Sequence, residues 1–335
     1  MQSILNLSFV RPIVIKLVRL YFRIRSIWPI WFYVLNREPR KLFLKNKPIL
    51  NDIQKRVLND LKTTGIAFTH VDELFPGQNL LPTLQGHLEE NRANARVETS
   101  QPFLKYVWDF VPTLDFKNPY VKVSLSDKVL DVVNSYMSMW SNFYLLTLNI
   151  TTPVGAGTEA STSQLWHRDS DDNRICKVFI YLDDVDRNAG PFTFIKGTTH
   201  GLKYGNLFPI TMDMPQDFLG KTIPEDKIIS GVGRAGSIIF CDATGIHMGG
   251  YAISKERLMF TASYRSKAAP YVARFKYPDN LSAQIKEAGI LPQAKYALRF
   301  NTPKVPQFLQ PFFSQKKSEK MQRKYQMEQS KIFVG

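Results

Sequence analysis

Apolar residues recur at helical spacing in two segments of the first half of the chain. The first segment follows Asn51 and Asp52, which are favourable helix caps, and ends before Gly65. The second follows Ser126 and Asp127 in the same way. The apolar positions are Ile53, Val57, Leu58 and Leu61 in the first segment and Val129, Leu130, Val133, Tyr136, Met137 and Trp140 in the second. The sequence therefore predicts a helix in each segment.

Strand-like patterns dominate residues 143–264, and a shorter candidate strand lies at residues 66–71. In residues 257–264 the alternation is strict: Arg257, Met259, Thr261 and Ser263 share one face, and Leu258, Phe260 and Ala262 share the other. An arginine at the start of an otherwise uncharged face is unlike an ordinary solvent-exposed surface residue. Residues 203–229 contain three prolines and interrupt the strands, and we expect this insertion to form a substrate wall or lid. The pattern predicts a mainly β domain with flanking helices.

Composition fits one folded domain with extensions at both ends. The 335 residues are 44% hydrophobic and 13% aromatic, which is enough for a strand-rich core. Cys176 and Cys241 both lie in apolar strand-like runs, so we expect free thiols in the core and no disulfide. Nothing in the cysteine usage indicates an oxidising compartment, and we expect a cytoplasmic protein.

The candidate chemistry lies at His167, Asp169, His247 and Arg257. Residues two apart on a strand end project from the same side, so His167 and Asp169 can reach one metal ion. A distant second histidine completes two imidazoles and one carboxylate, the ligand set of non-heme Fe(II) oxygenases. His200 competes with His247 as the second imidazole, and Asp171, Asp172 and Asp242 compete with Asp169 as the carboxylate. We select His247 because an arginine follows it ten residues later, and Asp169 because it alone is two residues from His167. We expect His70 to be a core or surface residue and His87 to lie on a solvated face.

Several motifs in this order resemble the phytanoyl-CoA dioxygenase family. They are Gln164-Leu165-Trp166-His167-Arg168-Asp169, Lys177-Val178-Phe179-Ile180-Tyr181-Leu182, Gly190-Pro191-Phe192, Gly197-Thr198-Thr199-His200, and His247 with Gly249-Gly250 and Arg257. The clear resemblance covers about residues 142–264, and a weaker match begins near Leu50. It implies a double-stranded β-helix, a jelly-roll or cupin-like fold. It also implies that the glycine-flanked His200 does not bind metal.

The resemblance implies Fe(II), 2-oxoglutarate and O2 as cofactors, and oxidation of a small-molecule or lipid-like substrate with release of succinate and CO2. Its implied metal ligands are His167, Asp169 and His247. An aspartate at position 169 favours hydroxylation over halogenation, because related halogenases lack this carboxylate. For the far carboxylate of 2-oxoglutarate we expect Arg257, whose planar guanidinium binds carboxylates bidentately. Lys177 is the alternative for that role, and Asn149 or Gln164 is expected to contact the co-substrate.

The chain carries a formal charge of +15, and much of this charge lies in residues 1–47, which contain ten Lys and Arg against one Glu. Apolar residues at helical spacing and the aromatic run at residues 28–33 suggest peripheral contact with an anionic membrane. Packing of the same apolar stripe on the catalytic domain, or a mitochondrial presequence, is an open alternative. We expect a basic amphipathic extension at residues 1–47, a dioxygenase domain at 48–312 with its β-helix core near 142–266, and a charged tail at 313–335.

Two other functions remain open at this stage. The basic charge raises the hypothesis of an oxidative demethylase acting on nucleic acid, but the arginine pattern after His247 fits that class less well, so nucleic acid is not the expected partner. A non-catalytic β-barrel binding protein is the second alternative. The intact set of His167, Asp169, His247 and Arg257 argues against it.

Overall fold

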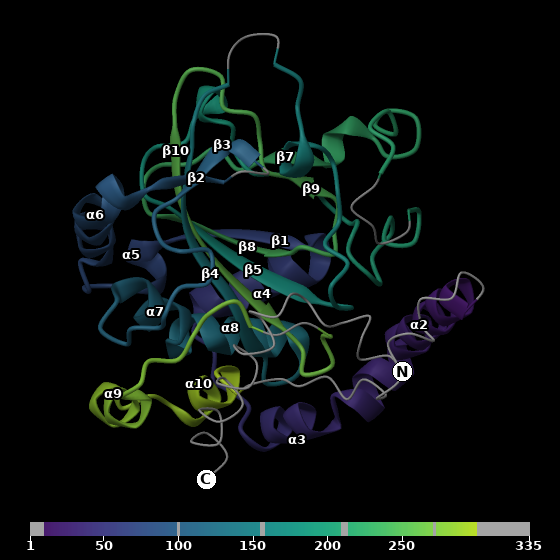
Figure 1. Cartoon of the computed structure of the whole chain (residues 1–335), viewed down its shortest axis with the longest axis horizontal. Helices are drawn as coiled ribbons and strands as arrows, with labels where there is room; N and C mark the ends of the chain where they lie inside the picture. The colour runs from purple at the N-terminus through teal and green to yellow at the C-terminus, as the bar shows by residue number, and fades with distance from the viewer. Residues whose placement is uncertain (1–9, 99–100, 155–157, 209–213, 271–272, 300–335) are drawn as a thin grey trace.

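Two facing antiparallel sheets form the body of the protein. A computed structural model describes residues 10–98, 101–154, 158–208, 214–270 and 273–299. The larger sheet has the strand order β1-β8-β5-β10-β4-β3-β2, and the smaller has the order β7-β6-β9 (Figure 1). The strands are β1 Ile66–His70, β2 Arg96–Glu98, β3 Gln101–Tyr106, β4 Asn142–Thr151, β5 Ile175–Tyr181, β6 Thr193–Ile195, β7 Ile228–Ser230, β8 Ser237–Asp242, β9 His247–Met248 and β10 Arg257–Arg265. The predicted double-stranded β-helix with flanking helices is confirmed.

The larger sheet has an outer face that meets helices and an inner face that meets the smaller sheet. The outer face is apolar and joins the main hydrophobic core; it carries Leu146, Leu148 and Ile150 of β4 and Leu258, Phe260 and Ala262 of β10. The alternate positions Thr147 and Asn149 of β4 and Thr261 and Ser263 of β10 form the inner face. All of these inner positions are buried as well. The alternation predicted for β10 therefore assigns the two faces correctly.

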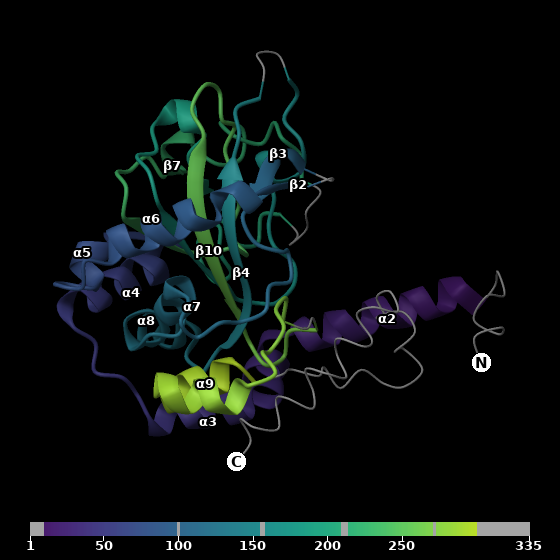
Figure 2. The ribbon, with the colours of Figure 1, turned by 60° about the vertical axis from the view of Figure 1, so that its left-hand side comes forward.

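Helices cover the outer face and one edge of the sheet (Figures 1 and 2). They are α3 Arg37–Lys45, α4 Asp52–Thr64, α5 Val71–Leu74, α6 Leu80–Asn91, α7 Pro119–Ser124, α8 Asp127–Met137, α9 Leu281–Ala288 and α10 Pro292–Ala297. Both predicted helices are confirmed. Asn51 and Gln54 form a capping box at the start of α4, and Gly65 ends it in the left-handed conformation. Ser126 caps α8, which stops at Met137, so Trp140 lies beyond the helix.

Two side-chain expectations have clear outcomes. Cys176 and Cys241 are free and buried, as predicted. The expectation that His87 lies on a solvated face is met only in part: the residue is half-buried, and its ring packs edge-on against Trp108 and Tyr120. An aromatic cluster distant in sequence covers this side of α6, which the local pattern of the helix does not reveal.

The N-terminal segment divides into a packed part and a projecting part. Trp31, in the wide helical turn η1 Ile30–Leu35, is 2% exposed and belongs to the main core. Helix α2 Val10–Ser26 projects away from the body in both views (Figures 1 and 2). Among the described residues, no helix combines the length and apolar character needed to cross a membrane. The domain boundary expected after residue 47 stays a prediction.

The insertion at residues 203–229 is described except for residues 209–213. Its side chains Tyr204, Phe218 and Ile223 cluster with Trp166, the neighbour of His167. The insertion therefore packs beside the candidate site. The charged tail expected at residues 313–335 lies outside the described residues.

Candidate active site

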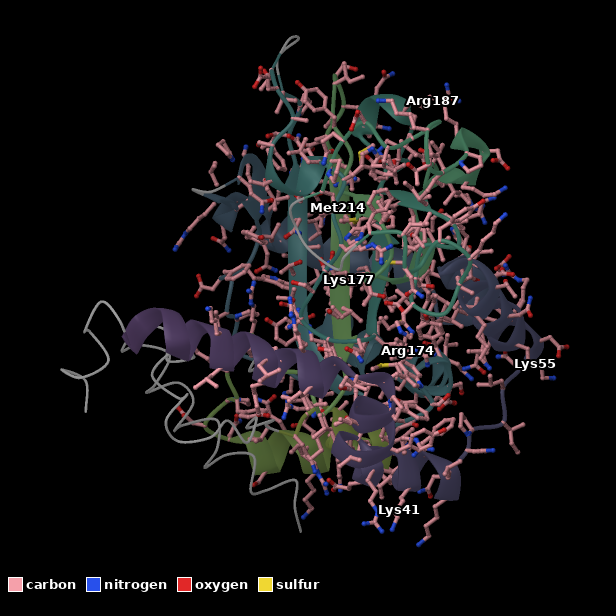
Figure 3. All side chains as sticks on the ribbon, turned by 90° about the vertical axis from the view of Figure 1, so that its right-hand side faces the viewer. Lys41, Lys55, Arg174, Lys177, Arg187 and Met214 are labelled. Carbon is pink, nitrogen blue, oxygen red and sulfur yellow. The ribbon has the colours of Figure 1, made fainter. Side chains whose placement is uncertain are left out.

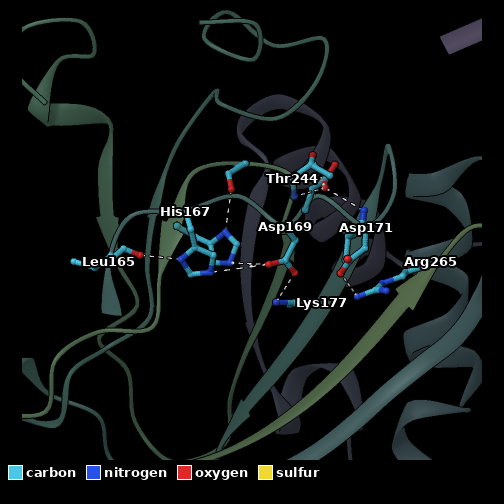
Figure 4. Close-up of polar contacts among 11 residues, drawn as sticks. Leu165, His167, Asp169, Asp171, Lys177, Thr244 and Arg265 are labelled. Carbon is cyan, nitrogen blue, oxygen red and sulfur yellow. Dashed lines mark hydrogen bonds and ion pairs between the residues drawn. The ribbon is translucent and has the colours of Figure 1, made fainter. Parts of the chain in front are cut away.

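His167, Asp169 and His247 converge between the two sheets, although 78 residues separate the last two. The backbones of His167 and His247 bond each other in both directions, with N–O distances of 3.0 Å. The ligand atoms of the three side chains all lie within 4.8 Å of one another (Figure 4). The structure thus brings together the three residues that the sequence selected, in a group that can hold one metal ion.

Backbone carbonyls orient both imidazoles. Nδ1 of His167 lies 2.8 Å from the carbonyl of Leu165, and Nδ1 of His247 lies 3.0 Å from that of Gly245. A carbonyl only accepts, so each Nδ1 carries the hydrogen and each Nε2 keeps its lone pair. The two Nε2 atoms lie 4.0 Å and 3.8 Å from Oδ1 of Asp169. Two imidazoles and one carboxylate with their lone pairs facing one point suit Fe(II).

Burial and neighbouring charges hold the three groups in the forms that bind metal. Burial, with His167 beside it, lowers the pKa of His247 to about 3. Burial also lowers the pKa of His167. For Asp169 burial alone would raise the pKa, but the positive Lys177 and the imidazoles outweigh it, and the pKa falls below its usual value. Neutral imidazoles and an ionised carboxylate need no deprotonation before they ligate a metal.

Lys177 lies at the metal group itself. Its Nζ is 2.7 Å from Oδ2 of Asp169, the oxygen that does not face the imidazoles (Figure 4). Figure 3 shows Lys177 near the middle of the molecule. Lys177 therefore neutralises the carboxylate and fixes its rotation, which leaves Oδ1 directed at both histidines.

Arg257 is a buried cation that has only neutral partners among the described residues. Its guanidinium donates to the carbonyl of Gly190 and, at 3.2 Å, to Oγ1 of Thr151, while Nε is buried with no acceptor. The side chain is 3% exposed, and burial lowers its pKa. A buried charge is costly unless it is paired, so this arrangement favours an anionic ligand.

Asn149 and Gln164 occupy different surroundings. Asn149 is on the inner face, where Nδ2 donates to Oγ1 of Thr147 at 3.2 Å and Oδ1 has no partner within the described chain. Gln164 belongs to a short turn, where its Oε1 accepts from the backbone N–H of Ser161 at 3.1 Å. Its Nε2 is buried without an acceptor in the described part of the structure. Contact of either residue with a co-substrate stays a prediction.

The rival residues are engaged elsewhere. The ring of His200 stacks on Trp28 at 5.0 Å between centroids. Asp171 pairs with Arg265, and Asp172 bonds the indole N–H of Trp31. Asp242 accepts from the hydroxyl of Tyr136 at 2.6 Å and from the backbone N–H of Thr244.

Arg168 is a site residue that the sequence argument missed. It stands between two candidate ligands but points away from them; it is fully buried and donates to the carbonyls of Gly205 and Thr244. It thereby ties the first ligand segment to the loop before His247 and to the insertion. Its place inside the motif was a signal, but only the three-dimensional structure supplies its partners.

Residues 109–258 match the family described as phytanoyl-CoA dioxygenase (PhyH). These residues form a phytanoyl-CoA dioxygenase family domain. The protein is thus an iron- and 2-oxoglutarate-dependent oxygenase, and iron and 2-oxoglutarate are its cofactors. No curated protein matches the chain.

Solved structures of several oxygenases are similar to this chain. HygX from Streptomyces hygroscopicus, with nickel, 2-oxoglutarate and hygromycin B bound, is 15% identical over 69% of this chain and 92% of its own, with a TM-score of 0.46. EctD from S. alaskensis, with bound Fe, is 14% identical over 67% and 81%, with a TM-score of 0.45. The epimerase SnoN, in complex with Fe3+, alpha ketoglutarate and nogalamycin RO, is 16% identical over 69% and 89%, with a TM-score of 0.45.

Proposed function

We propose that this PhyH-family protein hydroxylates a small-molecule or lipid-like substrate. The metal would be held by His167 and His247 through Nε2 and by Asp169 through Oδ1. The observation that carries the proposal is the convergence of these atoms within 4.8 Å, with both histidines buried. The bound iron, with 2-oxoglutarate and O2, supplies the oxidative chemistry: one oxygen atom enters a C–H bond of the substrate, and the other enters succinate as CO2 is released.

The protein's own residues prepare this chemistry by charge and orientation. Lys177 holds Oδ2 of Asp169 at 2.7 Å, so a single carboxylate oxygen faces the metal position. The Leu165 and Gly245 carbonyls fix the imidazole rings. The buried ring of Phe192 lies 5.6 Å from that of His247 and would exclude water from this side of the imidazole.

For the far carboxylate of 2-oxoglutarate we propose Arg257 rather than Lys177. The guanidinium of Arg257 is buried and lacks a carboxylate partner within the described chain, whereas Lys177 already pairs with Asp169. A lysine that contacts a metal ligand lies at the metal end of the co-substrate, too near the metal to bind the opposite end. Asn149, with its unpaired Oδ1, would lie beside the co-substrate as a polar contact.

Metal-dependent turnover tests this assignment. Purified protein with Fe(II), 2-oxoglutarate and O2 should form succinate, and His167→Ala, Asp169→Ala or His247→Ala should each abolish it, because two protein ligands hold iron weakly. His200→Ala is the matched control, since this exposed ring stacks on Trp28 and should leave turnover and Co(II) binding intact. Loss of Co(II) binding in His200→Ala but not in His247→Ala would overturn the triad.

We further propose that the protein associates peripherally with anionic membranes through α2. Eight of the fifteen exposed large apolar side chains among the described residues lie between Leu17 and Ile49. Four of them, Leu17, Leu20, Ile24 and Ile27, are 45–52% exposed. The first three share one side of α2 at three- to four-residue spacing, and Ile27 follows directly after the helix ends at Ser26. Exposed Lys16 and Arg23 flank this row. An apolar row beside basic residues is typical of helices that lie in an anionic bilayer surface.

Vesicle binding by the full chain tests the membrane proposal. The chain should float with phosphatidylserine-containing vesicles, less with phosphatidylcholine alone, and less as salt rises. Changing Leu17, Leu20, Ile24 and Ile27 together to Ser should abolish binding. The matched control changes four exposed apolar residues of the catalytic domain to Ser: Val97, Leu207, Val232 and Ile253. Equal binding by both variants, or a wild-type chain that dimerises through α2 and ignores vesicles, would overturn the proposal.

A further inference from the structure

Contacts with segments distant in sequence hold the loop that follows Asp169. Asp169 donates its backbone N–H to the carbonyl of Ala243 at 2.9 Å, and β5 begins only at Ile175. Between them, Asp171 pairs with Arg265 at 2.5 Å, at the end of β10 (Figure 4). The position of Asp169 therefore depends on how the rest of this short loop is fixed.

Asp172 joins this loop to the residue after β10 and to the N-terminal segment. Its Oδ2 accepts from the backbone N–H of Ser266 at 2.6 Å, just beyond β10. Its Oδ1 accepts from the indole N–H of Trp31 at 2.6 Å, across 141 positions of sequence. A hydrogen bond to a carboxylate is stronger than one between neutral groups. One carboxylate thus links the N-terminal segment to the loop that carries a metal ligand.

Further contacts reinforce the same junction. Nδ2 of Asn173 donates to the carbonyl of Ser26 at 2.8 Å. The guanidinium of Arg174 lies 4.9 Å from the centre of the Trp28 ring. Figure 3 shows Arg174 beside the N-terminal helices, below Lys177. Buried Asn36 closes the junction by donating to the carbonyl of Trp31 at 2.9 Å and accepting from the N–H of Ala268.

We propose that residues 26–36 act as a strap that positions the metal loop, with Trp31 as its principal positioning residue. Trp31 does not contact the metal group; it acts through Asp172, three residues beyond Asp169. The family match begins at residue 109, so the strap is a feature of this chain outside the matched region. The inference rests on the proposed metal site and adds a residue that tunes it.

The test removes the indole N–H and keeps an aromatic ring. Titration of metal-free Trp31→Phe with Co(II), followed by calorimetry and by visible absorption of the bound ion, should show about tenfold weaker binding, the range found for outer-shell partners of metal ligands. Trp140→Phe is the matched control, because Trp140 is also buried but its indole N–H has no acceptor within the described residues. The control should bind Co(II) as the wild type does.

A conservative change separates positioning from general stability. Asp172→Asn keeps an acceptor for the Trp31 indole and should retain Co(II) affinity better than Asp172→Ala, at matched unfolding midpoints of the metal-free proteins. If the wild-type protein binds Co(II) and Trp31→Phe binds it with the same affinity, the strap is refuted while the metal site stands. Equal losses of Co(II) affinity in Trp31→Phe and Trp140→Phe would also refute the strap. A wild-type chain that binds no Co(II) would overturn the metal site and the strap together.

Discussion

The outer and inner faces of the larger sheet are equally buried but differ in how their side chains are satisfied. On the outer face, Leu148 and Phe260 belong to the main apolar core, and the ring of Phe260 packs against Tyr120 of α7. On the inner face, Asn149, Ser263 and Arg257 each keep a buried polar atom without a partner among the described residues. Unpaired buried polar atoms reduce stability, whereas close apolar packing increases it. The same strands thus stabilise the fold with one face and retain binding capacity with the other.

The largest expected effect is on the inner face, at Arg257. Arg257→Ala leaves the far carboxylate of 2-oxoglutarate unpaired in a buried pocket, and breaking such a pair costs about 3–5 kcal/mol. The 2-oxoglutarate concentration needed for half-maximal succinate formation should therefore rise at least about 100-fold. Co(II) binding should persist. An unchanged requirement, with a large increase in Lys177→Ala, would transfer the role to Lys177.

On the outer face, Phe260→Ala should affect stability and not binding. Phe260 is fully buried, and its ring lies 4.8 Å from that of Tyr120. The cavity should lower the free energy of unfolding by about 3–5 kcal/mol, measured by urea denaturation. The 2-oxoglutarate requirement of the folded fraction should not change. Its neighbour on the inner face, Thr261→Val, should cost far less; equal losses would contradict the division between the faces.

A smaller effect is expected at Asn149. Loss of one hydrogen bond to the co-substrate is worth about 1–1.5 kcal/mol, so Asn149→Ala should raise the 2-oxoglutarate requirement about tenfold. Asn142→Ala is the control, because Asn142 is a buried asparagine of the same strand that bonds the carbonyl of Arg299, at the strand end away from Arg257. A similar increase in the 2-oxoglutarate requirement in both variants would show that Asn149 does not contact the co-substrate.

The smallest expected effect, at Ser263, has the opposite sign. Its hydroxyl is fully buried and has no partner within the described chain, so Ser263→Ala should leave stability unchanged or raise it by about 1 kcal/mol. Ser124→Ala should instead lose about 1 kcal/mol, because this buried hydroxyl donates to the carbonyl of Tyr120 at 2.8 Å. Urea denaturation of both variants measures these changes in the free energy of unfolding. A clear loss in Ser263→Ala would mean that the inner face is already satisfied.

The sequence by itself determined the alternation of faces, the helix caps and the residues that meet at the candidate metal group. Side chains alternate with a period of two in any strand, so the face of Arg257 relative to Phe260 was fixed before any partner was known. Asn51 and Gly65 act on neighbouring backbone, so the limits of α4 were also local.

Only the tertiary structure decided which distant groups those residues meet. The pairing of Lys177 with Asp169, of Arg168 with the carbonyl of Thr244, and of Trp31 with Asp172 depends on how β5, β8 and the N-terminal segment pack. It also divided residues 1–47, since Trp31 is buried in the core while Leu17 and Ile24 stay exposed. One amphipathic pattern fits a bilayer and a protein core equally well, because both remove apolar surface from water.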